Sequence, residues 1–358
     1  MKYIPLTSLM IVITGSILFS QTVDRHFNPT YTWTTFKEDF SDTTLNRQVW
    51  KPTIRYKRGL GFLVDSIETI KVEEGNLLLM MKKSPGYLDS LWSPDGWKKE
   101  YSDYVGGEVN SIRKFQYGVF ECRAKYAHKK GSWPAFWLFG DSAVLSPPGS
   151  IANEIDIAEL ARNGAYPKMM HVIHYYHPSK DAGITAHENP DRKIYSIARH
   201  EKYYTFKCIW TPQKIQYYID DTLKHEVINN NYEWYPKLPL NVYLSQQVTQ
   251  PETKKRRTKF IAPQASLFDW VTVKEFFLAP EITCPPAIAQ QDTASLDVDE
   301  RATNITWKLT PSELFSNSEG SGKSAIIRRI ANNNGTGTIT YTFNMPSGET
   351  FTVERDFN

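Results

Sequence analysis

The stretch NEIDIAELAR, residues 153–162, places three acidic residues among small and β-branched apolar ones. This alternation predicts a half-buried strand that carries carboxyl groups on one face. Glu154 and Asp156 are two positions apart and share that face, whereas strict alternation would turn Glu159 to the other side. We therefore expect one extra residue, a β-bulge at positions 157–158, because bulges re-aim side chains and are common beside active sites.

Carboxyl groups crowded in this way suit the cleavage of glycosidic bonds. A retaining glycosidase needs an ionised nucleophile and a protonated acid/base, about 5–5.5 Å apart. With the bulge, Glu154 and Glu159 lie about 13 Å apart along the backbone at roughly 3.3 Å per step, so their side chains must lean inward over Asp156. Crowding separates the pKa values of such groups and hence their roles. A strand edge with solvated acids is the alternative interpretation, which the acids alone would favour.

Two upstream segments change this balance: YGVFECRAK at residues 117–125 and GSWPAFWL at residues 131–138. Together with the acidic stretch they resemble glycoside hydrolase family 16, in the bulge-containing branch of laminarinases, agarases and carrageenases. The resemblance extends over roughly residues 36–277 in several ordered motifs. It implies an all-β fold, a concanavalin-like β-jelly roll of two curved antiparallel sheets with an active-site cleft.

The resemblance also implies roles for the three acids. Glu154 corresponds to the nucleophile, Asp156 to its assistant and Glu159 to the acid/base. We expect a retaining endo-glycanase acting by double displacement, with laminarin-type β-1,3-glucan as the preferred substrate. A β-galactanase acting on agar, porphyran or carrageenan is the alternative. A non-catalytic polysaccharide-binding lectin is the competing class. A lectin that descended from an enzyme and lost its activity would, however, be expected to have lost at least one of the three acids.

Other residues are candidates for holding the substrate. Trp133 matches the family's cleft tryptophan, and Trp137 shares its face if the intervening proline leaves the alternation intact. His174 matches a cleft histidine of the family, and Trp92 lies in an aromatic loop that either faces the cleft or packs beneath itself. A basic run at residues 253–259 is usually only a solvated loop, but it supplies two guanidinium groups suited to sulfate, those of Arg256 and Arg257.

The resemblance implies no cofactor for catalysis. Many relatives hold a structural calcium ion, and the matching positions here are Asp39, Gly75 and Asp269. Oxygen ligands suit Ca²⁺, although Asp39 is equally a plausible turn acid. Three cysteines are present without any metal-binding spacing, and we expect packed free thiols at Cys122 and Cys208.

The ends of the chain predict export and a second domain. A basic start, an apolar run and a small-residue cleavage point predict a secretory signal peptide and a secreted, extracellular, periplasmic or surface-associated protein without a membrane span. The C-terminal part is rich in Ser, Thr, Asn and Gly with short alternating strands, and resembles an Ig-like accessory module of secreted Bacteroidetes proteins. The expected organisation is a signal peptide at 1–20, a lead-in at 21–35, the catalytic β-jelly roll at 36–278, a linker at 279–288 and the Ig-like domain at 289–358.

The net charge of +3 is close to balance. It argues against a protein built to bind nucleic acid. We expect a monomer whose only partner is its polysaccharide substrate.

Overall fold

The computed structural model describes residues 25–54, 56–58, 60–93, 96–140, 152–160, 168–178, 185–196, 202–249, 260–331 and 335–358. Within these ranges the secondary structure is almost wholly β, with a single 3₁₀ turn, η1 (Ser312–Leu314). No helix in the described part is long and apolar enough to cross a membrane. The expected signal peptide at 1–20 lies outside the described residues.

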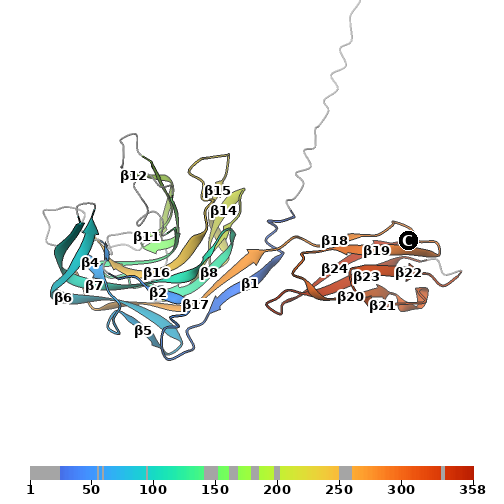
Figure 1. Cartoon of the computed structure of the whole chain (residues 1–358), viewed down its shortest axis with the longest axis horizontal. Helices are drawn as coiled ribbons and strands as arrows, with labels where there is room; N and C mark the ends of the chain where they lie inside the picture. The colour runs from blue at the N-terminus through green and yellow to red at the C-terminus, as the bar shows by residue number, and fades with distance from the viewer. Residues whose placement is uncertain are drawn as a thin grey trace, which may run out of the picture.

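Two curved antiparallel sheets form the larger part of the protein (Figure 1). The first sheet carries the cleft and contains, in spatial order, β2 (Trp50–Pro52), β7 (Gly96–Phe115), β16 (Leu240–Val248), β9 (Ser132–Phe139), β10 (Ala152–Leu160), β11 (Lys168–Pro178) and β12 (Thr185–Ser196). The second contains β5 (Ile70–Glu73), β6 (Asn76–Ser93), β1 (Thr32–Glu38), β17 (Gln264–Phe276), β8 (Gly118–Lys125), β13 (Tyr204–Trp210), β14 (Lys214–Ile219) and β15 (Thr222–Ile228). Two short strands, β3 (Tyr56–Arg58) and β4 (Gly61–Leu63), join at the edge formed by β7. This is the expected β-jelly roll.

The core lies between the two sheets. Alternate residues of β8 and β13 point inward, and they meet the inward faces of β9, β10 and β16. The fully buried aromatic side chains include Phe120, Phe136, Phe206 and Trp210. Because the core occupies one face of the first sheet, the opposite face is left to line the cleft.

The chain continues into two smaller sheets, which lie beside the ends of β1 and β17 (Figure 1). One contains β18 (Glu281–Thr283), β19 (Gln291–Asp297) and β22 (Ser324–Arg328); the other contains β21 (Glu319–Ser321), β20 (Thr303–Thr310), β23 (Gly337–Asn344) and β24 (Thr350–Phe357). The short strands expected in this part from alternation are confirmed, among them β20, β22, β23 and β24. They enclose a core of their own, as a small β domain does.

The junction between the two parts is packed. The ring of Phe277 contacts Phe351, with centroids 4.8 Å apart, and the Thr34 hydroxyl donates to Glu349 at 2.6 Å. The stretch 279–288, expected as a linker, contains β18 and contributes Ile282 and other apolar side chains to the smaller core. Its prolines are compatible with this because they flank the short strand. The domain boundaries and the Ig-like class stay predictions.

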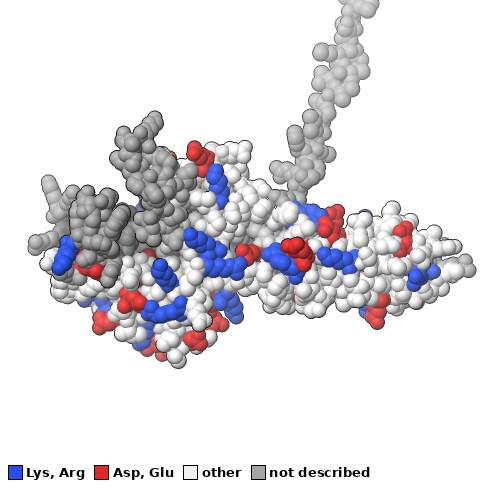
Figure 2. Space-filling model, in the orientation of Figure 1, with Lys and Arg blue, Asp and Glu red and all other residues white. Residues whose placement is uncertain are grey.

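The distribution of charged side chains and the state of the cysteines agree with the sequence analysis. Lys and Arg are interspersed with Asp and Glu over the face shown in Figure 2. Cys122, Cys208 and Cys284 are free and buried, so the expectation of packed thiols is confirmed.

Candidate functional site

A cleft of about 260 Å³ opens on the face of the first sheet that is turned away from the core. Side chains from β9, β10, β11, β12 and β16 line it: Trp133, Ala135, Trp137, Glu154, Asp156, Glu159, Met170, Val172, His174, Tyr176, His187, Asn189, Arg192 and Gln247. The cleft therefore brings together the three acids, both tryptophans of the WPAFW segment and the histidine that the sequence singled out.

A bulge at Ile157 puts the three acids on one face. Asp156 lies opposite Trp137 of β9, and Ala158 lies opposite Phe136, so Ile157 has no partner on that strand. The side chains of Ile157 and Ala158 are both in the core, and alternation resumes with Glu159 in the cleft. The bulge expected from the spacing is thus confirmed.

Two buried side chains hold the backbone of the bulge. The carbonyl of Ile157 accepts a hydrogen bond from Nδ1 of His171, and the carbonyl of Ala158 accepts one from the Tyr126 hydroxyl at 3.0 Å. Burial lowers the pKa of His171 to about 3 and raises that of Tyr126 well above its ordinary value. His171 therefore stays neutral and Tyr126 stays a donor, so both carbonyl groups keep their partners across the physiological pH range.

Replacement of Tyr126 by Phe is expected to destabilise the protein by about 1–3 kcal/mol, the cost of a buried carbonyl without its partner. It should also lower turnover, because the bulge aims Glu159. Urea unfolding and initial rates test this. Tyr235→Phe is the matched control, since that buried hydroxyl donates to the Thr211 carbonyl at 2.7 Å away from the bulge. Equal rates in the two variants at equal loss of stability would contradict the positioning role.

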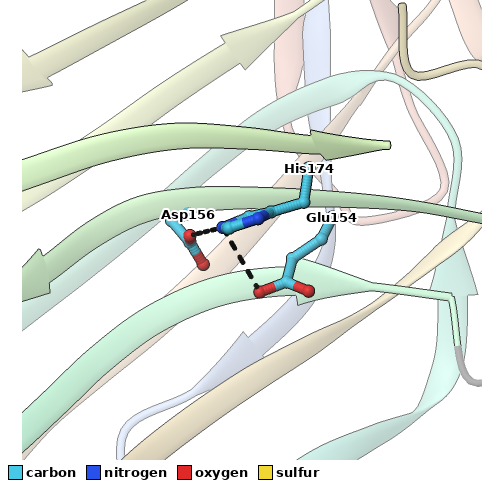
Figure 3. A group of neighbouring side chains, drawn as sticks. All are labelled: Glu154, Asp156 and His174. Atoms are coloured by element: carbon cyan, nitrogen blue, oxygen red, sulfur yellow. Dashed lines mark hydrogen bonds and ion pairs between the residues drawn. The ribbon is translucent and has the colours of Figure 1, made fainter. Parts of the chain in front are cut away.

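Glu154 and Asp156 are both linked to His174 (Figure 3). Nε2 of His174 lies 2.9 Å from Oδ2 of Asp156 and 3.9 Å from Oε1 of Glu154. Burial disfavours the charged ring, but the hydrogen bond to Asp156 and the charges of the acids outweigh it and raise the pKa of His174 to about 9. The ring is therefore an imidazolium at neutral pH, and it offsets part of the negative charge beside Glu154.

Glu159 lies in a different environment. It is buried, and Nε1 of Trp133 donates a short hydrogen bond to its Oε1. Burial and the charge of Asp156 raise the pKa of Glu159 to about 8, against the opposing effects of Trp133 and His174. Glu159 is therefore protonated at neutral pH, as a general acid has to be.

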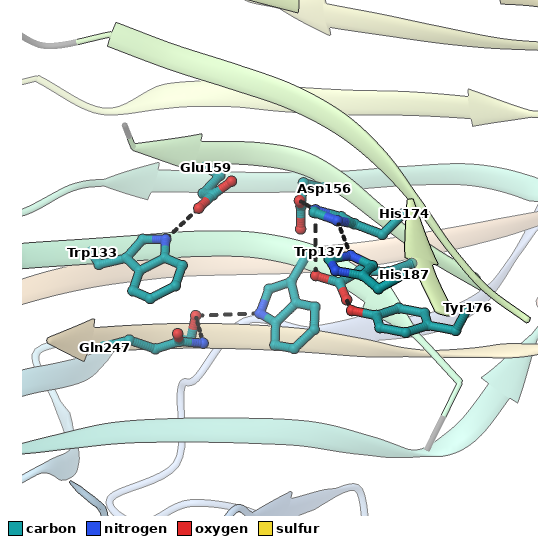
Figure 4. Close-up of polar contacts among 10 residues, drawn as sticks. Trp133, Trp137, Asp156, Glu159, His174, Tyr176, His187 and Gln247 are labelled. Atoms are coloured by element: carbon teal, nitrogen blue, oxygen red, sulfur yellow. Dashed lines mark hydrogen bonds and ion pairs between the residues drawn. The ribbon is translucent and has the colours of Figure 1, made fainter. Parts of the chain in front are cut away.

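Two further residues from β11 and β12 complete the arrangement (Figure 4). The Tyr176 hydroxyl donates to Oε2 of Glu154 at 2.8 Å. Nδ1 of His174 lies 2.8 Å from Nε2 of His187, with the two rings only 20° apart. The ring of His187 also stacks on Tyr176, with centroids 4.5 Å apart. His187 thus contacts both residues that hold the carboxylates of Glu154 and Asp156.

Three cleft side chains, Glu154, Asp156 and His174, could each present one ligand atom to a metal ion, within 4.8 Å of the others. In this structure Nε2 of His174 is engaged in the hydrogen bond to Asp156 instead, and we assign no metal to these residues.

The positions expected for calcium do not fit a cation site either. The carboxylate of Asp269 pairs with the Arg123 guanidinium, which brings a positive charge to that place. Asp39 accepts a hydrogen bond from the backbone N–H of Ser41 and lies 3.7 Å from Nζ of Lys37. Gly75 occupies a turn with a φ of 68°. We therefore assign no calcium to these residues.

Three of the candidate substrate-binding residues cannot be placed. Arg256 and Arg257 lie outside the described residues. Trp92 belongs to β6, but its side chain is not in the described part.

Several cleft residues were missed by the sequence analysis. Tyr176, His187, Arg192 and Gln247 come from strands whose cleft-facing side is set by neighbouring strands. A recognisable signal existed for Tyr176 alone, because it is two positions from His174 and so shares its face.

The model of glycosyl hydrolases family 16 matches residues 63–263, which contain β10 and the whole cleft. The chain belongs to glycosyl hydrolase family 16. Within this family, the keratan-sulfate endo-1,4-β-galactosidase of Sphingobacterium multivorum is 30% identical over 125 residues, or 34% of this chain and 28% of that protein. The β-glucanase of Bacillus licheniformis is 24% identical over 247 residues, or 68% of this chain and 88% of that protein.

The chain spans 28% and 23% of the length of the first two curated relatives it matches. Solved structures agree on the fold. The laminarinase catalytic domain of Thermotoga petrophila has a TM-score of 0.52 at 21% identity and covers 68% of this chain and 98% of its own. The κ-carrageenase of Pseudoalteromonas carrageenovora also has a TM-score of 0.52 at 21% identity, with coverage of 67% and 92%.

Proposed function

We propose that this family 16 protein is a secreted, retaining endo-glycanase that cleaves β-linked polysaccharide by double displacement. The observation that carries the proposal is the contrast between two glutamates on one face of β10. Glu154 accepts a hydrogen bond from the Tyr176 hydroxyl and lies beside His174, whereas Glu159 is buried and its pKa is raised to about 8. Different environments for two carboxyl groups are how one site provides both a nucleophile and an acid.

In the first step, a Glu154 oxygen bonds to the anomeric carbon while the glycosidic bond breaks. Glu159 gives its proton to the departing oxygen. In the second step, Glu159 takes a proton from water, the water oxygen bonds to the anomeric carbon, and Glu154 leaves. Two inversions give net retention, and the chain's own carboxyl groups suffice without a cofactor.

His174 and Tyr176 hold the nucleophile and its neighbour during these steps. The Tyr176 hydroxyl fixes the orientation of Glu154, and the His174 imidazolium fixes Asp156. His187 accepts the second N–H of His174, because an imidazolium has two donors. His187 is therefore a positioning residue.

His187→Ala should lower kcat by roughly 10- to 100-fold, the range for the loss of one hydrogen bond to a charged group, with little change in KM. Removal of the acceptor should also lower the pKa of His174, which ¹H–¹⁵N NMR of the ring nitrogens measures. His177→Ala is the control, because His177 stacks on Tyr175 on the other face of β11. An unchanged His174 pKa in His187→Ala would contradict this role.

Two classes of polysaccharide are candidate substrates. The WPAFW segment favours laminarin-type β-1,3-glucan, and the relatives of this chain include proteins named β-glucanase. A cationic side chain in the cleft, Arg192, favours a sulfated β-galactan as the second candidate. A lectin would use the same cleft for binding without turnover.

Release of reducing ends from laminarin, lichenan, agarose, porphyran and κ-carrageenan tests the proposal. The anomeric configuration of the first product, followed by NMR, tests retention. Cleavage with a β-anomer formed first is expected. Binding without cleavage across this panel would contradict the glycanase and support the lectin. An α-anomer formed first would rule out double displacement.

A further inference from the structure

The cleft has a second bulge, on β12, that faces the acidic strand across β11. Tyr175 of β11 pairs with Glu188, and Ile173 pairs with Asp191. Two residues of β12 therefore stand opposite one residue of β11. The bulge contains Asn189 and Pro190, and a proline is tolerated here because a bulged residue leaves the hydrogen-bond ladder.

This bulge decides which charge enters the cleft. His187 and Asn189 line the cleft, so unbroken alternation would bring Asp191 into it next. Instead, Asp191 pairs with His225 of β15 at 2.6 Å, on the side where the ring of His225 stacks over Tyr217 of the core. Arg192 lines the cleft. The bulge has therefore replaced a carboxylate with a guanidinium in a cleft that already holds three acids.

The position of the guanidinium relative to Glu159 follows from the register. Nη2 of Arg192 lies 3.0 Å from the sulfur of Met170, and Met170 is the β11 partner of Glu159. Trp133 contacts Glu159 from the other side, on β9. β9 and β12 are three strand spacings apart, roughly 14 Å, which leaves room for a sugar ring between the side chains of Trp133 and Arg192.

The guanidinium of Arg192 has N–H groups available to bind a ligand in the cleft. Among the described residues, no carboxylate forms an ion pair with it, and its hydrogen-bond partner there, the thioether sulfur of Met170, is a weak acceptor. A guanidinium presents its N–H groups as a planar fork that matches the oxygens of a sulfate ester. An arginine that only balanced the local acids would be expected to pair with one of them.

We propose that Arg192 forms an anion-binding subsite that takes a sulfate ester on the sugar held beside Glu159, and that the substrate is a sulfated β-glycan. This inference rests on the proposed function, and it decides between the two candidate substrate classes. Trp133 supplies the apolar surface for that sugar, and Arg192 selects its substituent.

The test compares sulfated galactans with their desulfated forms. Wild type, Arg192→Ala and Arg192→Lys are assayed on κ-carrageenan, porphyran and keratan sulfate, each before and after solvolytic desulfation, and on laminarin. For the sulfated polymer that is cleaved, kcat/KM should fall roughly 10- to 100-fold in Arg192→Ala, the range for hydrogen bonds to charged groups. The desulfated polymer should change less than about threefold, and lysine should restore activity only in part because it lacks the fork.

Lys193→Ala is the matched control. It removes one positive charge from the next position of β12, which alternation places on the opposite face. An equal loss in Lys193→Ala would mean general attraction of a polyanion, and would overturn the subsite. Wild-type cleavage of laminarin alone, or equal losses on sulfated and desulfated polymers in Arg192→Ala, would overturn it while the glycanase remained. Absence of cleavage on every polymer, with binding retained, would instead remove the proposed function.

Discussion

Replacement of Glu154 by Gln is expected to abolish turnover. An amide has almost the same shape as the carboxylate and can still accept the Tyr176 hydroxyl, but it does not attack the anomeric carbon. Loss of a covalent nucleophile lowers kcat by on the order of 10⁴- to 10⁶-fold. Release of reducing ends from the polymer cleaved by the wild type measures the effect. Binding of that polymer should be retained, which isothermal titration calorimetry can follow.

Chemical rescue makes this result specific to the nucleophile. In Glu154→Ala, the space left by the side chain admits azide, which should attack an activated aryl β-glycoside from the side that Glu154 occupied. The product is then an α-glycosyl azide, with inverted configuration. Rescue in Glu159→Ala should give the β-azide, because the covalent intermediate still forms there. Substantial activity of Glu154→Gln without azide would exclude Glu154 as the nucleophile.

Replacement of Glu159 by Gln is expected to lower kcat/KM on polysaccharide by about 10²- to 10⁴-fold, the usual contribution of a general acid. The wild-type pH profile should show the same group. The pKa of Glu159 is raised to about 8, so the proton needed for the first step is present below that pH and is lost as pH rises through it. Activity should therefore fall above about pH 8. In Glu159→Gln the fall near pH 8 should be absent, and the remaining basic limb should lie near pH 9, where the His174 imidazolium loses its proton.

The leaving group separates this role from a purely structural one. A substrate with a good leaving group, such as a 2,4-dinitrophenyl glycoside, needs no proton from Glu159 in the first step. Its bond cleavage should be affected far less than that of the polymer. Equal losses on both substrates, with the basic limb unchanged, would contradict the assignment of Glu159 as the acid.

The acidic strand could be derived from the sequence because its evidence is local. The five-residue spacing between Glu154 and Glu159 conflicts with alternation, and only an added residue resolves the conflict. Trp133 and Trp137 followed from the same counting along β9. Wherever one residue of a strand was known to face the cleft, alternation thus predicted the other cleft-facing residues of that strand.

The anion subsite could not be derived in this way. The face of β12 on which Arg192 lies depends on a bulge, and this bulge is visible only in the pairing of β12 with β11. His187 likewise owes its place to the two strands that bring it beside His174. The basic run around Arg256 drew attention as a cluster of charge, whereas the cation that lines the described cleft is a single residue with no distinctive neighbours.

The bulge at Ile157 also bears on how this active site can change over generations. Without Ile157, the chain would read Glu-Ile-Asp-Ala-Glu, and plain alternation would keep all three acids on one face. A bulged and an unbulged strand are therefore separated by a single codon, with the catalytic side chains conserved on either side of the event. The carbonyl partners Tyr126 and His171 are what would become superfluous. Insertion or deletion at this point is thus a route between related lineages that need not pass through an inactive ancestor.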